Sequence, residues 1–123
     1  MLFTKLALVT AVLSVSQVAA ESKCYDDGGS WSNINEAQQK TDSWCEAYGN
    51  ANYGPGSQIK TCVPYSGGKI MIRMKNGAGT TQWLDKTQCQ AMLLYFIYYC
   101  AHGGRDDSSP GWRPRADPGE GCD

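Results

Sequence analysis

Three segments of the sequence combine an aromatic ring with polar side chains suited to binding hydroxyl groups. The candidate glycan-binding residues are Asp26, Asp27 and Trp31 in the first segment, Asn50, Asn52 and Tyr53 in the second, and Trp112, Arg113, Arg115 and Asp117 in the third. An aromatic face packs against the apolar side of a sugar ring, and amide, carboxylate and guanidinium groups bind hydroxyls in pairs. The alternative for each segment is a turn whose aromatic side chain packs onto the core.

The sequence offers little for catalysis. His102 is the only histidine, which excludes mechanisms that need two imidazoles. A ribonuclease using His102, Arg105 and Asp106 or Asp107 remains an alternative. His102 is also explained by a helix C-terminus, where the dipole favours a cation and a glycine ends the helix. We therefore predict no catalytic residues and a protein that is not an enzyme.

Metal, cofactor and glycosidase chemistry are also not predicted. The cysteines include no CxxC pair and only one histidine is present, so zinc-finger spacing is absent. Glycoside hydrolysis needs two carboxylates across a cleft. The pairs Asp26-Asp27 and Asp106-Asp107 are adjacent in polar turns, where neighbours usually point in different directions. We predict neither a metal site nor a cofactor.

The N-terminus has the pattern of a secretory signal peptide. Met1 to Lys5 is a positive start, Leu6 to Val15 is apolar, and Val18-Ala19-Ala20 supplies small residues for cleavage. We predict a signal peptide over residues 1–20 and one secreted, extracellular domain over residues 21–123. No apolar run reaches the roughly 20 residues that a membrane-spanning helix needs.

Six cysteines behind a signal peptide predict three disulfides. The cysteines are Cys24, Cys45, Cys62, Cys89, Cys100 and Cys122. Cys89 and Cys100 fall on one predicted helix, where their spacing puts them about 16 Å apart. A disulfide needs Cα atoms within about 7 Å, so we predict that each pairs with a cysteine elsewhere.

The periodicity predicts an α+β fold, in which an antiparallel sheet packs against two helices. Asn33 and Glu36 form an N-cap pattern for a helix ending at Gly49, and Asp85 and Gln88 do so for a second. The predicted elements are the first helix up to Gly49, a loop over 50–57, strands over 58–64, 69–75 and 80–84, a helix over 86–102, and an irregular tail over 105–123. Asn76-Gly77 predicts a hairpin turn before the third strand.

In the strand 69–75, alternation predicts Ile70, Ile72 and Met74 on the core and a solvent-exposed opposite face with Met71. Lys69, Arg73 and Lys75 would line that exposed face. A toxin acting on membranes or channels would need such a cationic stripe, and an ordinary wet sheet face explains it equally well. The whole chain carries 11 basic and 12 acidic residues, a balance that offers no electrostatic attraction for nucleic acid or anionic membranes.

The C-terminal region resembles that of small secreted cysteine-rich fungal proteins. The matching residues are Cys100-Ala101-His102-Gly103-Gly104, Gly111-Trp112 and the run from Arg115 to Cys122. Within that group the chain is most similar to mushroom glycan-binding, lectin-like proteins. The resemblance implies an αβ-sandwich whose antiparallel sheet continues across a dimer. More distantly, the plan is similar to the killer toxins of smut fungi and to secreted fungal effectors.

The sequence thus predicts a secreted, non-catalytic glycan-binding protein of defence or recognition. Its expected partners are glycans of glycoproteins or cell surfaces, with no nucleic acid and no membrane span. Weak single sites would gain avidity from a homodimer formed through a strand edge. The alternatives are a toxin or effector that acts on membranes or host proteins, and a small ribonuclease.

Overall fold

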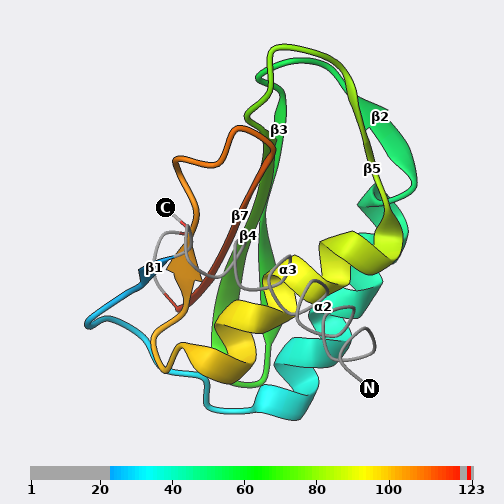
Figure 1. The fold of residues 1–123 in the computed structure, drawn as a ribbon. Helices are drawn as coiled ribbons and strands as arrows, with labels where there is room; N and C mark the ends of the chain where they lie inside the picture. Colours follow the sequence, from blue (N-terminus) through cyan, green and yellow to red (C-terminus); the bar gives the residue numbers. More distant parts are fainter. Residues whose placement is uncertain (1–22, 120–121, 123) are drawn as a thin grey trace, which may run out of the picture.

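Two helices pack against one face of a five-stranded antiparallel sheet (Figure 1). The computed structural model describes residues 23–119 and residue 122, so the predicted signal peptide over residues 1–20 lies outside the described residues. The helices are α2 (Ile34–Tyr48) and α3 (Lys86–Tyr99). The strands are β1 (Lys23–Cys24), β2 (Ala51–Tyr53), β3 (Gln58–Tyr65), β4 (Gly68–Asn76), β5 (Gln82–Leu84), β6 (Gly104–Arg105) and β7 (Trp112–Pro118). This arrangement confirms the predicted α+β fold.

The five-stranded sheet has the order β1-β6-β7-β4-β3, and β2 pairs with β5 in a separate ribbon. In Figure 1 this ribbon lies at the far end of the molecule from β1 and β6. Ile70, Ile72 and Met74 of β4 are fully buried and join the core with Leu93 and Phe96 of α3. The predicted inward face of β4 is therefore confirmed.

The opposite face of β4 is less exposed than the alternation predicts. Met71 is fully buried, although it has the parity of Arg73 and not that of Ile70. The register places Met71 between Cys62 of β3 and Asp117 of β7. Cys62 is bonded to Cys122, so a disulfide lies next to Met71 on this face. The prediction that this face is uniformly wet is wrong at Met71.

Helix α2 begins at its predicted cap. The Asn33 Oδ1 atom accepts a hydrogen bond from the Glu36 backbone N–H at 3.0 Å. The Glu36 carboxylate accepts from the backbone N–H of Ser66 at 3.0 Å, and it also accepts from the Ser66 hydroxyl. The cap thus ties the start of α2 to the turn between β3 and β4.

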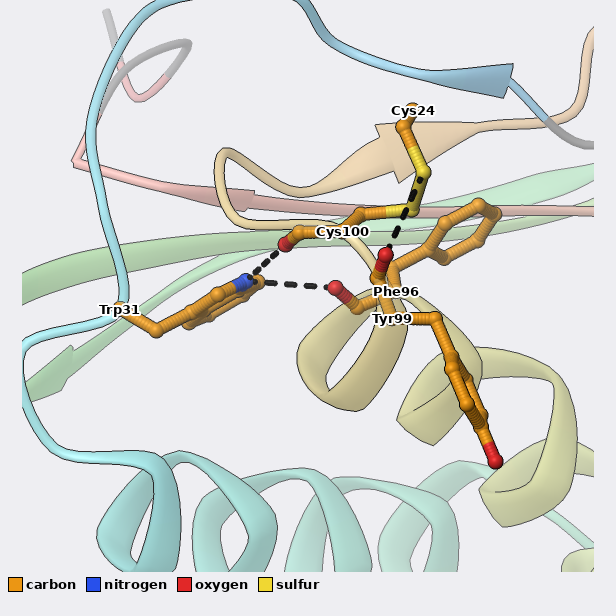
Figure 2. Close-up of a disulfide and its surroundings, with 5 residues drawn as sticks. All are labelled: Cys24, Trp31, Phe96, Tyr99 and Cys100. Atoms are coloured by element: carbon orange, nitrogen blue, oxygen red, sulfur yellow. Dashed lines mark hydrogen bonds between the residues drawn. A yellow bond between two sulfur atoms is a disulfide. The ribbon is translucent and has the colours of Figure 1, made fainter.

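Helix α3 ends at Tyr99, three residues before the predicted end at His102. The Trp31 indole N–H donates to the carbonyl oxygens of Phe96 and Cys100, at 3.2 and 2.9 Å (Figure 2). Cys100 has extended backbone dihedrals and is bonded to Cys24 of β1. The disulfide and the indole together end the helix, because they draw Cys100 toward the sheet and satisfy a terminal carbonyl. Within the described residues, neither helix combines the length and the apolar content needed to cross a membrane.

The three disulfides are Cys24–Cys100, Cys45–Cys89 and Cys62–Cys122. As predicted, Cys89 and Cys100 do not pair with each other. Cys45–Cys89 joins the two helices, and Cys24–Cys100 joins the end of α3 to β1. Helix α3 is therefore fixed at both ends to different parts of the fold.

The predicted irregular tail is wrong, because it contains a long strand of the sheet. Strand β7 pairs with β4 along its whole length and with β6 at Arg115 and Ala116. Pro114 is compatible with this place because its carbonyl oxygen, which points toward the β6 side, accepts from Asp106 N–H at 2.9 Å. The missing N–H of Pro114 faces the same side, where the two-residue β6 has already ended.

The predicted hairpin at Asn76-Gly77 is also wrong. Strand β5 pairs with β2, a segment predicted as a loop, and not with β4. The fully buried Asn76 amide donates to the carbonyl oxygens of Tyr53, Gly54 and Thr80 at 3.0, 3.1 and 2.8 Å. Its Oδ1 atom accepts from Ala78 N–H and the Gln82 side chain at 2.9 and 2.6 Å. Asn76 thus holds the β2–β5 ribbon against the end of β4.

Replacing Asn76 with alanine should lower the free energy of unfolding by about 2–4 kcal/mol, because buried carbonyls and an amide lose their partner. Asn52→Ala is the control, since Asn52 is exposed in the same ribbon, and its effect should stay within about 0.5 kcal/mol. Urea denaturation of both variants measures the difference. Equal stability of the two would show that Asn76 does not hold the ribbon.

Candidate functional site

A hollow of about 630 Å³ lies between the loop that follows β1 and the end of β7. It is lined by Tyr25, Asp26, Asp27, Gly28, Arg115 and Asp117. Its volume is in the range of small-molecule sites. The lining combines one aromatic ring with carboxylates and a guanidinium, which is the mixture that hydroxyl-rich ligands require.

The loop is held against the sheet by its two ends. Cys24 is bonded to Cys100, and the Tyr25 backbone N–H donates to the Gly103 carbonyl oxygen at 2.9 Å. Gly28 has a φ of 108°, a conformation that favours glycine. Gly29 lies so close to β7 that a Cβ atom there would collide with the Pro118 carbonyl oxygen. The loop therefore returns to the sheet beside the end of β7.

Arg115 and Asp117 reach the hollow because they alternate along β7 with the buried Ala116. The Arg115 guanidinium and the Asp117 carboxylate form an ion pair at 3.2 Å. The pairing fixes the orientation of both groups on the sheet face.

The Tyr25 ring contacts two guanidinium groups. The Cζ atoms of Arg105 and Arg115 are each 5.8 Å from the ring centroid, within the range of cation–π contact. Burial raises the pKa of Tyr25 above its ordinary value, the charge of Arg115 acts against this, and that of Asp117 adds to it. The phenol is therefore neutral at physiological pH, and the ring is fixed by its charged neighbours.

Asp107 links the two arginines that pair with Arg115 in the neighbouring strands. Its carboxylate forms ion pairs with Arg73 and Arg105, each at 2.8 Å. Burial raises the pKa of Asp107. The hydrogen bond and the charge of Arg73, together with the charges of Arg105 and Arg115, lower this pKa by more than burial raises it. The net pKa lies below the ordinary 3.8. Asp107 is thus held in its charged form by the surrounding arginines.

The structure brings together two of the three predicted segments. Asp26 and Asp27 of the first and Arg115 and Asp117 of the third line one hollow. Arg113 of the third segment lies elsewhere on β7, and its Nε–H donates to the Ser109 carbonyl oxygen at 2.8 Å. The combination of these two segments could not be read from the sequence, because the tail was not predicted as a strand.

The two predicted tryptophans serve the fold. Trp112 is 7% exposed and belongs to the core, and Trp31 is partly buried with its indole bonded to the end of α3. We therefore leave both out of the site.

The second predicted segment lies in the β2–β5 ribbon and does not line the hollow. The Tyr53 hydroxyl donates to the Tyr48 carbonyl oxygen at 2.6 Å, and its ring contacts Trp112 edge to face. The Asn50 side chain accepts from the Lys86 backbone N–H at 2.9 Å, at the start of α3. Asn52 is exposed opposite Trp83. Tyr53 and Asn50 thus have structural contacts.

The residues of the ribonuclease alternative are engaged in local structure. Asp106 is 1% exposed and accepts from the backbone N–H groups of Ser108 and Ser109 at 3.0 and 2.9 Å. His102 lies in the turn after α3, and its Nδ1 atom is 3.1 Å from the Gly29 carbonyl oxygen. Asp106 is thus enclosed by the backbone of its own turn.

Tyr25 is a site residue that was not predicted from the sequence, and Arg105, which was named only for the ribonuclease alternative, contacts its ring. Tyr25 directly precedes the predicted Asp26-Asp27 pair, so an aromatic residue next to the two carboxylates was visible in the sequence. Arg113, Arg115 and Asp117 alternate with Pro114, Ala116 and Pro118, and this period of two was a strand signal hidden by the prolines.

A second hollow, of about 430 Å³, lies at the end of α3 and is mainly apolar. Its lining residues are Ser30, Trp31, Ile34, Ile97, Tyr98, Tyr99, Cys100 and Ala101. None of them is charged. The hollow beside Tyr25 is therefore the better candidate for a hydroxyl-rich ligand.

No protein-family model matches the chain, and no curated protein matches it significantly. The interpretation of the site consequently depends on its geometry.

Asp107 should make stability depend on pH. A carboxyl whose pKa is lowered by folding adds stability above its ordinary pKa, and that stability is lost as the pH falls through the lowered value. Between about pH 5 and about pH 1, the native protein should therefore lose more stability than Asp107→Asn does. Urea denaturation across this range tests this, with Asp42→Asn as the control. Parallel curves for the native protein and Asp107→Asn would contradict the role of the arginines.

Proposed function

We propose that the protein is a non-catalytic, lectin-like glycan-binding protein whose site is the hollow beside Tyr25. One observation carries the proposal: the hollow combines an aromatic ring with carboxylates from two separate chain segments and an oriented guanidinium. The Tyr25 ring offers an apolar surface to a sugar ring. The carboxylates of Asp26 and Asp27, from the loop after β1, can accept hydrogen bonds from sugar hydroxyls. The Arg115 guanidinium, from β7, can donate hydrogen bonds to them.

The same site is poorly suited to catalysis. Arg115 is paired with Asp117, and Tyr25 is held neutral by its raised pKa. His102 contacts the Gly29 carbonyl oxygen and is not among the residues that line the hollow. These contacts favour recognition over proton transfer. A secreted molecule of this kind would act in defence or recognition by binding glycans of glycoproteins or cell surfaces.

A glycan array probed with the oxidised protein tests the proposal, followed by calorimetry with the strongest neutral ligand. Asp27→Asn should weaken that ligand about tenfold or more, because a charged acceptor of sugar hydroxyls becomes a neutral amide. Glu46→Gln, on the exposed side of α2, is the charge-matched control and should bind as the native protein does.

Absence of binding to every glycan on the array would refute the proposal. Cleavage of RNA that is lost in His102→Ala would replace it with the ribonuclease alternative. Glycan-independent leakage of dye from liposomes would replace it with the toxin alternative.

We also propose that two copies pair through the outer edge of β3, which would raise avidity for multivalent glycans. Strand β3 is the edge of the five-stranded sheet and pairs only with β4 among the described strands. An added strand would bind there by main-chain hydrogen bonds. Light scattering after gel filtration should give a dimer, and Lys60→Pro should give a monomer, because Lys60 pairs with Arg73 and its N–H points away from β4 to the outer edge. A native protein that is monomeric at concentrations saturating the array would contradict the pairing.

A further inference from the structure

A row of basic residues crosses all strands of the five-stranded sheet. In the backbone register Lys23 of β1 pairs with Arg105 of β6, and Arg105 pairs with Arg115 of β7. Arg115 pairs with Arg73 of β4, and Arg73 pairs with Lys60 of β3. Adjacent strands are about 4.8 Å apart, so the row extends about 19 Å across the sheet.

The row lies on the sheet face opposite the helices. Residues directly opposite each other in antiparallel strands point to the same side. The contacts agree, since Asp107 bridges Arg73 and Arg105, and the Tyr25 ring contacts both Arg105 and Arg115. The neighbouring positions Ile72 and Ala116 have the other parity and are buried in the core.

Like charges opposite each other destabilise a sheet, so a row of basic residues has a cost that the fold must offset. Asp107 and Asp117 offset part of it through their ion pairs with Arg73, Arg105 and Arg115. Counting the five basic residues against these two carboxylates and against Asp26 and Asp27, which line the hollow on the same face, leaves a net charge of +1. The remaining repulsion between the basic residues destabilises the sheet, and a bound anionic ligand would reduce this repulsion.

The middle and the ends of the row differ in exposure. The side chains of Arg73 and Arg115 are only 12% and 21% exposed, whereas that of Arg105 is 49% exposed. Lys23 and Lys60, at the two ends, are also exposed. The central guanidinium groups therefore organise the face, and the outer groups are accessible to a ligand.

A small hollow of about 200 Å³ opens at the Lys23 end, lined by Lys23, Arg105, Asp107 and Ser108. It is smaller than the usual small-molecule site, so it suits one substituent of a ligand and not a whole ligand. Among the described residues, Lys23 forms no ion pair, and the only one of Arg105 is made by its Nε atom. The Lys23 ammonium, the outer Arg105 nitrogens and the Ser108 hydroxyl are donors for an anion.

The small net charge of the whole chain does not reveal that most of its basic residues lie on one face of the sheet. Lys69, Lys75 and Arg113 occupy positions of the same parity as the row. The remaining basic residues of the described chain are Lys40 and Lys86, which lie on the helices. Balanced totals of 11 basic and 12 acidic residues are thus compatible with one positive face.

We propose that the sheet face selects acidic glycans, with a sulfate or carboxylate of the sugar bound in the hollow of Lys23, Arg105 and Ser108. This inference rests on the proposed function, because the neutral part of the same glycan occupies the hollow beside Tyr25. The Tyr25 ring, which lines the first hollow, contacts Arg105, which lines the smaller one. Asp26 and Asp27 repel the anionic group from the first hollow, which orients the glycan.

A glycan fits this face better than a nucleic acid does. Single-stranded nucleic acids bind on aromatic platforms that stack successive bases. Here Tyr25 is the one aromatic residue, among those described, that lines the two hollows, and the most exposed aromatic residues, Trp83, Tyr98 and Tyr99, lie on β5 and α3. A continuous phosphate chain would also meet Asp26 and Asp27.

An array on which each neutral glycan is printed beside its sulfated, sialylated and glucuronidated forms tests the selection. The acidic form should bind about tenfold tighter or more at low ionic strength, where the charged hollow is least screened. The ratio of the affinity for the acidic form to that for the neutral form should fall toward one as added salt shortens the Debye length from about 30 to about 3 Å. The sulfated and carboxylated forms together show which anion the hollow prefers.

Lys23→Gln should remove the preference for acidic forms and leave the neutral form bound as before. Lys40→Gln is the matched control, because it removes the same charge from α2 and should keep the preference.

Equal binding of neutral and acidic forms would overturn the inference and leave the proposed function in place. No binding to any glycan would refute the proposed function itself. An oligouridylate that competes more strongly than any acidic glycan would make this face a nucleic-acid site and overturn the inference.

Discussion

The antiparallel register of β4 with β3 and β7 is the constraint on which the rest of the structure depends. It turns Ile70, Ile72 and Met74 toward the helices and Arg73 toward the opposite face. A slip of one residue would exchange the two sets, because side chains alternate across a strand. The apolar contacts with α3 thus fix the position of Arg73, and with it the alignment of the basic row.

The disulfides and the Trp31 indole position the loop that lines the proposed site. Cys24–Cys100 and the two indole hydrogen bonds join β1, the following loop and the end of α3 (Figure 2). The first site residues follow Cys24 directly in the chain. The loop is therefore ordered before a ligand arrives, which reduces the entropic cost of binding.

Local chemistry made much of the fold predictable from the sequence. The caps at Asn33 and Asp85 depend on side chains within three residues, and both helices begin where predicted. The cysteine spacing on α3 excluded one pairing by length alone. Such features are readable because their partners are near in the sequence.

The rest depended on distant partners and could not be read in this way. The prolines of β7 argue against a strand, and they are tolerated only because the neighbouring β6 is two residues long. Hydrogen bonds of the Asn76 side chain hold β5 beside β2, where the sequence predicts a hairpin with β4. Some residues of the proposed site were named from the sequence. Asp27 and Asp117 were named, but their meeting at Tyr25 depends on the loop returning to β7 at Gly29.

The measurement that most directly tests the central claim is an amide NMR titration of the oxidised protein with the tightest acidic glycan from the array. The structure predicts that the largest shifts fall on the sheet face, at Tyr25 to Gly28, Arg105, Ser108 and Arg115. The amides of α2 should shift little, because that helix lies across the core from the site. Shifts confined to Trp31, Tyr98 and Tyr99, around the apolar hollow at the end of α3, would contradict the account.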